Sequence, residues 1–238
     1  MHDKASTTAI LIFSRTASRE ADVKTFDPSL GKSGNKLVAR YLIRQTVKTA
    51  RKTGLPVFLC YDNAAADLSF GQRFADAVEG VFQKGYSKLI TIGNDSPELT
   101  TKVLTEAAHQ LEQNNMVVGP AVDGGIYLLG LGQNQYNRAA FIDLPWQTAQ
   151  LQHAFPQCFS AENATLVWLD ELSDIDNSRD FKALLRRLSV FSGLLIQLLR
   201  LLAGRSHDYP LNPPSPLSFF YFLDIAPFRG PPLPCQCT

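Results

Sequence analysis

One stretch of the chain, residues 87–131, constrains the fold more than any other. It contains three short apolar runs, Leu89–Ile92, Met116–Val118 and Ile126–Leu131, each bounded by Gly, Pro, Asn or Asp. Such bounded runs are typical of buried strands. Apolar residues recur at three- and four-residue spacing across residues 103–111, which predicts an amphipathic helix between the first two runs. The stretch therefore predicts the order strand, helix, strand, strand.

Two aspartates flank these predicted strands. Asp95 follows the first apolar run, and Asp123 comes shortly before the third. In an open α/β sheet, ligands bind at the edge where the strands end. Hard divalent cations prefer carboxylate oxygens, so we expect both aspartates to line one cavity and to hold Mg²⁺ or Mn²⁺. Neighbouring glycines, which let the backbone approach a ligand closely, are Gly93, Gly124 and Gly125.

Both acids have a simpler alternative role in capping turns or helices. Asp95 or Ser96 would serve as the N-cap of the predicted helix, with Pro97 in its first turn. For Asp95 and Asp123 together, on adjacent strand ends, the shared ligand site is the interpretation that we favour.

The N-terminal half of the chain alternates in the same way between strand and helix patterns. The predicted elements are a strand at 8–13, a helix at 37–53, a strand at 56–61 and a helix at 69–84. This alternation predicts an α/β fold with three layers, a doubly wound and mostly parallel sheet with helices on both faces.

Residues 14–36, between the first predicted strand and the first predicted helix, read as a polar loop. Arg15 and Lys24 are among its five basic residues. Basic side chains placed after a first strand can hold a phosphate, although a solvated charged loop is the interpretation that this pattern alone favours. The loop has neither a Gly-x-Gly-x-x-Gly pattern nor a Walker motif, which argues against an ordinary dinucleotide site or P-loop.

The chain continues with a predicted helix at 147–159 and a predicted strand at 165–169. Asp174 follows that strand and either completes the metal site or positions the acceptor; the alternative is that the acids here serve the next helix. Asp176 or Ser178 would cap a helix that runs to residue 188. Trp146 either lines the acceptor side of the cavity with its aromatic face or is a core residue.

Residues 189–238 differ in composition, so we divide the chain into a domain at 1–188 and an extension at 189–238. The Leu-rich run at 188–203 is interrupted by Gln197 and Arg200 and is too short for a transmembrane span. We expect it to pack on the domain, to form a homodimer with a second copy, or to lie on a membrane surface, in that order.

Composition excludes some classes of function. A net charge of +1 gives no bulk attraction for nucleic acid. The four cysteines form neither a disulfide framework nor a zinc-site spacing, and Cys60 lies in an apolar run as a buried thiol. Together with an N-terminus that lacks the order of a signal peptide, this predicts a cytoplasmic protein.

Two segments carry a resemblance to a known family. Gly93–Leu99 (GNDSPEL) and Gly119–Gly130 (GPAVDGGIYLLG) resemble the paired motifs of glycosyltransferase-A-like, nucleotide-diphospho-sugar transferase-like proteins, also called selenodomain- or arsenosugar-associated transferases. Shorter matches follow the family's order at Phe70–Phe74, Leu144–Thr148 and Asp174–Phe181.

The resemblance covers roughly residues 7–188 and implies a nucleotide-diphospho-sugar transferase (GT-A) fold. It implies a metal-dependent transferase with a nucleotide-activated donor and a small-molecule acceptor, a nucleotide-sugar glycosyltransferase. The alternatives are a nucleotidyltransferase of the same fold and a non-catalytic nucleotide-binding descendant. The implied residues are Asp95 and Asp123 for catalysis, Asp95, Asp123 and Asp174 for the cation, and Ser14, Arg15, Lys24, Gly93, Gly124, Gly125 and Trp146 for the donor.

The sequence departs from the family pattern in two segments. The family's Lys-Thr-Arg-Leu is here Lys24-Thr25-Phe26-Asp27, so a bidentate arginine contact to phosphate would be lost. In the second departure, Gln72 replaces a glutamate.

Overall fold

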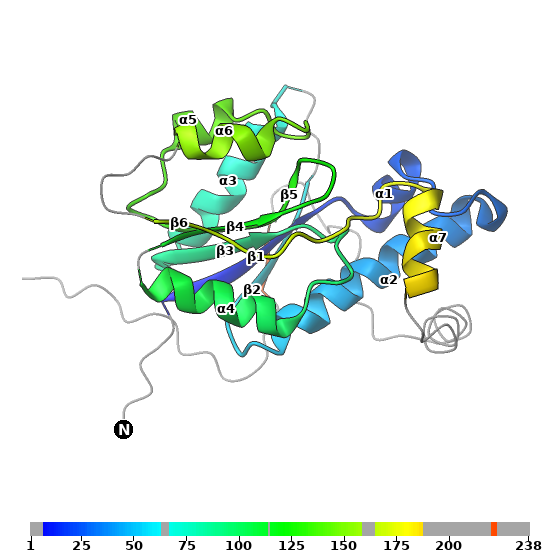
Figure 1. Ribbon diagram of the computed structural model, residues 1–238, viewed down its shortest axis with the longest axis horizontal. Coiled ribbons are helices and arrows are strands. Elements are labelled where there is room, and N and C mark those ends of the chain that lie inside the picture. The colour runs from blue at the N-terminus through cyan, green and yellow to red at the C-terminus, as the bar shows by residue number, and fades with distance from the viewer. Residues whose placement is uncertain (1–6, 63–66, 114, 159–164, 188–219, 223–238) are drawn as a thin grey trace, which may run out of the picture.

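In the computed structural model of the protein, seven strands form one sheet that lies between two layers of helices (Figure 1). The structure describes residues 7–62, 67–113, 115–158, 165–187 and 220–222. The strands, in chain order, are β1 (Thr8–Ser14), β2 (Val57–Tyr61), β3 (Lys88–Ile92), β4 (Met116–Pro120), β5 (Ile126–Gly132), β6 (Leu166–Trp168) and β7 (Phe220–Phe222). Their order across the sheet is β6-β4-β5-β3-β1-β2-β7.

Most strands of the sheet run in one direction. β1 pairs in parallel with both β2 and β3, and β4 pairs in parallel with β6. β5 lies between β3 and β4 and is antiparallel to both, and β7 is antiparallel to β2. The predicted mostly parallel α/β sheet is therefore confirmed, with β5 as an inserted antiparallel strand.

Helices cover both faces of the sheet. The helices are α1 (Ala17–Val23), α2 (Gly31–Arg51), α3 (Phe70–Phe82), α4 (Thr101–Glu112), α5 (Arg138–Asp143), α6 (Leu151–Cys158) and α7 (Ser178–Arg187), with a 3₁₀ turn at Pro28–Leu30. In Figure 1, α3, α5 and α6 lie over one face and α2 and α4 over the other, while α1 and α7 lie beside α2. The predicted three layers are therefore present.

The core follows the two-residue period of the strands. All seven residues of β1 are buried, and alternate side chains enter different apolar clusters. Leu11 packs with the side chains under α3, whereas Ile10 and Ile12 pack with those over α2 and α4. A third cluster, which includes Phe26 and Phe181, joins α1, α2 and α7.

The predicted polar loop at 14–36 is wrong, because most of it is helical. Thr16 caps α1 by accepting a hydrogen bond from the Arg19 amide, and Asp27 caps the 3₁₀ turn in the same way. α2 then begins at Gly31, six residues before the predicted start. Helix α5 was not predicted, since only six residues form it.

None of the helices in the described ranges is long and apolar enough to cross a membrane. The extension at 189–238, the homodimer expected through it and the Leu-rich run at 188–203 lie outside the described residues, apart from β7. That short strand extends the sheet beyond β2.

Candidate functional site

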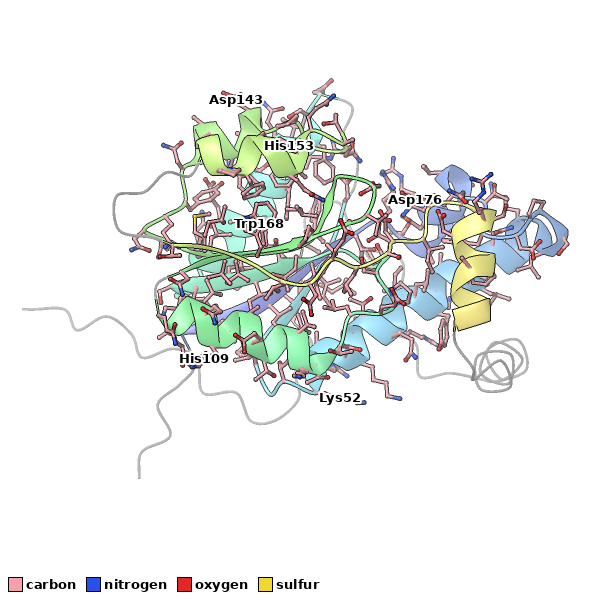
Figure 2. All side chains as sticks on the ribbon, in the orientation of Figure 1. Lys52, His109, Asp143, His153, Trp168 and Asp176 are labelled. Atoms are coloured by element: carbon pink, nitrogen blue, oxygen red, sulfur yellow. The ribbon has the colours of Figure 1, made fainter. Side chains whose placement is uncertain are left out.

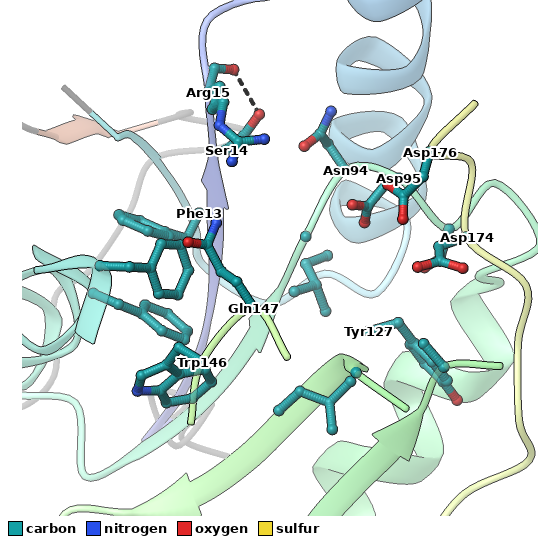
Figure 3. Close-up of a pocket in the computed structure, with 18 of the residues that line it drawn as sticks. Phe13, Ser14, Arg15, Asn94, Asp95, Tyr127, Trp146, Gln147, Asp174 and Asp176 are labelled. Atoms are coloured by element: carbon teal, nitrogen blue, oxygen red, sulfur yellow. Dashed lines mark hydrogen bonds between the residues drawn. The ribbon is translucent and has the colours of Figure 1, made fainter. Parts of the chain in front are cut away.

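A cavity of about 500 Å³ lies where the strands and the loops that follow them meet (Figure 3). Ser14 at the end of β1 and Asp95 after β3 line it, as do Asp123 before β5 and Asp174 after β6. A cavity of this size is typical of small-molecule sites. The structure therefore brings Asp95 and Asp123 to one cavity, as the sequence led us to expect.

Three carboxylates in this cavity form a cluster that could hold a cation. Asp123, Asp174 and Asp176 each offer an oxygen atom, and the three atoms lie within 4.8 Å of one another. Asp123 also accepts a hydrogen bond from the Gly125 amide at 2.7 Å, which fixes its orientation. The sequence named Asp95 instead of Asp176 as the third member of such a cluster.

Asp176 does not cap α7, and neither does Ser178. The side chain of Asn177 accepts hydrogen bonds from the backbone amides of Arg179 and Asp180 at 2.8 and 3.2 Å. In turn, the Asp180 carboxylate accepts a hydrogen bond from the backbone amide of Asn177 at 3.2 Å. The expected cap was therefore wrong by one residue, and the carboxylate of Asp176 is available to the cavity.

Burial and the like charges of this cluster both raise the pKa of Asp174. Burial raises the pKa of Asp174 to about 7, and the neighbouring charges of Asp123, Asp176 and Asp95 act in the same direction. A carboxylate that is hard to ionise among other carboxylates is one that a bound cation would favour in its charged form. The cluster therefore fits a divalent cation electrostatically.

Lys24 lies at the acidic end of the cavity with its ammonium group surrounded by oxygen atoms. Its Nζ is 2.6 Å from Asp176, 3.0 Å from Asp95 and 3.2 Å from Glu20, and it donates to the Ile175 carbonyl at 3.3 Å. Burial lowers the pKa of Lys24, but the three carboxylates outweigh burial and raise it above its usual range. The ammonium expected to bind a phosphate is thus bound by protein carboxylates.

The Lys24 ammonium also controls the ionisation of Asp95. Burial raises the pKa of Asp95, but the charge and hydrogen bond of Lys24 reverse this effect and hold the pKa below its usual range. The Asp95 side chain remains 33% exposed towards the cavity. Asp95 is therefore an ionised carboxylate that faces the site.

Glu20 is a site residue that sequence reasoning missed. Its side chain is only 3% exposed, and it lies 3.2 Å from Lys24 and 3.5 Å from Arg15. Its four-residue separation from Lys24 would have paired the two on a helix, but α1 was predicted as loop.

The loop after β3 carries two further residues that the sequence did not single out for ligand binding. The side chains of Asn94 and Ser96 are 6% and 7% exposed and line the cavity. The Asn94 Nδ2 and the Ser96 Oγ have no hydrogen-bond partner among the described residues. Thr100, and not Asp95 or Ser96, caps α4, so the helix-capping alternative was wrong for these two residues. Asp123 does cap its turn, because it accepts from the Gly125 amide, and it also lines the cavity. Buried polar atoms without partners point to a bound ligand.

The glycines of the site act mainly by making room. A Cβ on Gly93 would lie 2.8 Å from Asp95 Oδ1, and a Cβ on Gly125 would lie 3.0 Å from Asp123 Oδ1. Gly93 and Gly125 thereby let the two carboxylates lie against the backbone. Gly124, with a φ of +92°, lies against the backbone of Ala149 and is not among the residues that line the cavity.

The two departures from the family pattern have structural roles. Phe26 is fully buried against Phe181, with ring centroids 6.2 Å apart, and does not line the cavity. Gln72 closes a capping box at the start of α3, because its side chain accepts from the Ser69 amide at 2.7 Å. Neither Phe26 nor Gln72 lines the cavity.

Ser14 and Trp146 lie away from the acidic cluster. Ser14 donates its hydroxyl to the Arg15 carbonyl at 2.7 Å, and Arg15 projects over the cavity (Figure 3). Trp146 is half-buried among aromatic rings and donates its indole N–H to the Phe141 carbonyl at 2.6 Å. Trp146 is therefore at once a packed residue and a wall of the cavity.

Part of the chain matches a family of bacterial proteins. Residues 39–148 match the family described as "Uncharacterized protein conserved in bacteria (DUF2064)". No curated protein matches the sequence.

Solved structures resemble the whole fold. A provisionally named nucleotide-diphospho-sugar transferase from Desulfovibrio desulfuricans G20 superposes with a TM-score of 0.67 at 20% identity, over 83% of this chain and 97% of that one. Rv0371c from Mycobacterium tuberculosis H37Rv gives a TM-score of 0.50 at 12% identity, over 76% of this chain and 98% of that one. The fold is therefore of the nucleotide-diphospho-sugar transferase type, as the resemblance implied.

Proposed function

We propose that the protein is a metal-dependent transferase that uses a nucleotide-activated donor, a nucleotide-sugar glycosyltransferase with a small-molecule acceptor. The observation that carries this proposal is the convergence of four aspartates from three loops on one cavity, Asp95, Asp123, Asp174 and Asp176. The fold supports it, because α/β sheets of this kind bind nucleotides where their strands end.

Asp123, Asp174 and Asp176 would hold the cation, which supplies charge screening for the donor diphosphate and stabilises the leaving oxygen. Carboxylates are the ligands that Mg²⁺ and Mn²⁺ prefer, and the pKa of Asp174 is raised by burial and then by the neighbouring carboxylates, both of which a bound cation would offset. Asp95 faces the same cluster, so it would act at the edge of the cation site.

The donor would be bound by groups that the protein leaves available. Asn94 and Ser96 supply buried polar atoms that have no partner in the described part of the chain, and Arg15 supplies a cation whose contact with Glu20 is a long 3.5 Å. Lys24 orients Asp95 and Asp176, so we assign it to holding the carboxylates in place. We therefore assign the contact with the donor phosphate to Arg15.

Calorimetric titration of the full chain tests the proposal. Nucleotides and nucleotide sugars are titrated with and without Mg²⁺ or Mn²⁺, using the wild type, Asp123→Asn and Asp174→Asn. We expect binding that requires the metal and weakens at least about tenfold in either variant, because each loses one anionic ligand. Asp143→Asn is the matched control, since this exposed aspartate lies on α5, far from Asp176 (Figure 2).

The reaction products distinguish a sugar transferase from a nucleotidyltransferase. A sugar transferase releases a nucleoside diphosphate, whereas a nucleotidyltransferase releases pyrophosphate from a triphosphate. If no nucleotide binds in the presence of metal, the proposal fails, and a non-catalytic descendant that has lost nucleotide binding is supported. Equal loss of binding in Asp143→Asn would show that the effect is not local to the cavity.

A further inference from the structure

The end of the cavity opposite the aspartates has a different chemistry. Aromatic rings from β1, α3 and the segment after α5 line it, and we call this part the aromatic recess; its rings are Phe13, Phe70, Phe74 and Trp146. Figure 3 shows Phe13 and Trp146 on one side of the cavity and Asp95, Asp174 and Asp176 on the other. The two ends therefore suit different parts of one ligand, or two ligands.

The recess is built rigidly. The ring centroid of Phe70 lies 5.7 Å from that of Phe13 and 5.9 Å from that of Trp146. The indole N–H of Trp146 is bonded to the Phe141 carbonyl, so the indole is held in orientation and its own polar atom is satisfied. Phe70 and Trp146 are only half-buried, which leaves parts of both rings open to the cavity.

Gln147 adds a polar group beside these rings. It is the one non-glycine residue with positive φ among the described residues, at 62°, and it is exposed. Its side-chain amide lies in the cavity between Trp146 and Arg15 (Figure 3). A residue held in an unfavourable backbone conformation at a cavity wall is a pointer to function.

The lining limits what the recess can accept. Ile126, Leu129 and Leu151 belong to the same apolar cluster as the rings and line the cavity with them. Gln147 and Thr148, which follow Trp146 in the chain, add polar groups to the lining. Asp62 also lines the cavity, but its carboxylate accepts from Arg73 Nη2 at 3.1 Å and is neutralised there. A charged group packed among the rings would lack a counter-charge there, since Arg15 lies beyond the Gln147 amide as seen from Trp146 (Figure 3), and a polyhydroxylated ring would leave hydroxyls without partners.

We infer that the aromatic recess binds an uncharged planar ring, packed against Trp146 and Phe70 and hydrogen-bonded at its edge by Gln147. The inference rests on the proposed transferase function, which supplies two sources for such a ring. One is the base of the nucleotide donor, and the other is an aryl group of the acceptor. Aromatic faces and a single amide with both donor and acceptor atoms suit either ring.

The fluorescence of Trp146 reports on the recess directly. The other tryptophan, Trp168, is 43% exposed on β6 and is not among the residues that line the cavity, so the full chain with Trp168→Phe has one indole, at the recess. This protein is titrated without metal with the four nucleosides, with benzyl alcohol and with methyl glucoside. We expect a saturable change in emission with a nucleoside or with benzyl alcohol, and none with methyl glucoside.

Two further variants in the Trp168→Phe background make the test specific. Gln147→Gly keeps the left-handed backbone that glycine adopts freely, and Phe70→Leu keeps an apolar side chain. Both should weaken ring binding at least threefold. A nucleoside response assigns the recess to the donor base, and a benzyl alcohol response assigns it to the acceptor.

Three results overturn the inference. They are no response to any ring ligand, an equal response to methyl glucoside, and ring binding that neither variant weakens. Because the titration omits metal, it is independent of the calorimetric test. If nucleotide binds in a metal-dependent way but the emission of Trp146 does not change, the inference about the recess is contradicted and the proposed function is not.

Discussion

The ammonium of Lys24 neutralises a carboxylate that solvent scarcely reaches, since the Glu20 side chain is 3% exposed. Lys24→Met keeps most of the side-chain length and removes the charge. The variant leaves the buried Glu20 with only its longer contact to Arg15, at 3.5 Å, and breaking a buried pair in this way costs about 3 kcal/mol. We expect the free energy of unfolding, measured by urea denaturation, to fall by about that amount.

Lys32→Met provides the matched control for this charge removal. Lys32 pairs with Asp22 at 2.6 Å, but the two side chains are 79% and 48% exposed. Exposed pairs contribute less than about 1 kcal/mol, so this variant should change stability little. The double variant Lys24→Met/Glu20→Gln should recover part of the loss. Equal losses for Lys24→Met and Lys32→Met would contradict the burial argument.

Asp174 should make the metal-free protein less stable as the pH rises. Its pKa in the folded protein is about 7, whereas the usual value is 3.8. Between about pH 4 and pH 7 the folded state therefore binds more protons than the unfolded state, and stability falls as the pH rises. Asp174→Asn cannot ionise, so relative to the wild type it should gain stability across this window. Urea unfolding of both proteins in a chelator, from pH 4 to pH 8, checks this; a constant difference would refute it.

Single residues also show which parts of the candidate site could be predicted from the sequence. Asp95, Asp123 and Asp174 were named from their places beside predicted strands, and all three line the cavity. Asp176 was taken for a helix cap because residues 176–178 are all of types that cap helices, and only the three-dimensional structure selects Asn177.

Ser69 and Gln72 form a capping box at the N-terminus of helix α3. Each side chain accepts a hydrogen bond from the backbone amide of the other residue. Ser69→Ala removes one of these bonds and should lower the free energy of unfolding by about 1 kcal/mol. Gln72→Glu, which restores the family's residue, should keep the box and leave stability nearly unchanged. Urea denaturation measures both, and a loss in Gln72→Glu as large as that in Ser69→Ala would contradict the assignment.

Helix α1 illustrates an element that local pattern could not predict. It has seven residues, of which only Ala17 and Glu20 are buried, so it lacks the apolar stripe that identified the longer helices. Its position depends on the packing of α1, α2 and α7 around a shared apolar cluster. The consequence for the site is large, because α1 places Glu20 and brings Lys24 to the carboxylates.

For the molecule as a whole, the alternation of strand and helix predicted the fold class but not the position of every strand. Local pattern showed β5 as a strand, but its antiparallel insertion between β3 and β4 is a long-range pairing that no local pattern contains. That insertion brings Asp123, at the turn from β4 into β5, next to the loop that follows β6. The acidic cluster is thus a product of topology, and the sequence alone could name its members only in part.

The division of the chain at residue 188 makes a prediction about the entire molecule. In the described part of the chain, the residues of the three apolar clusters fall between Ala9 and Phe181, so a chain of residues 1–188 retains the whole of this core. We expect it to unfold in one cooperative transition in urea. Loss of β7 leaves β2 as a sheet edge, and an open apolar edge favours self-association, which light scattering would detect. A truncated chain without a cooperative transition would contradict the division, because the extension would then be part of what holds the core together.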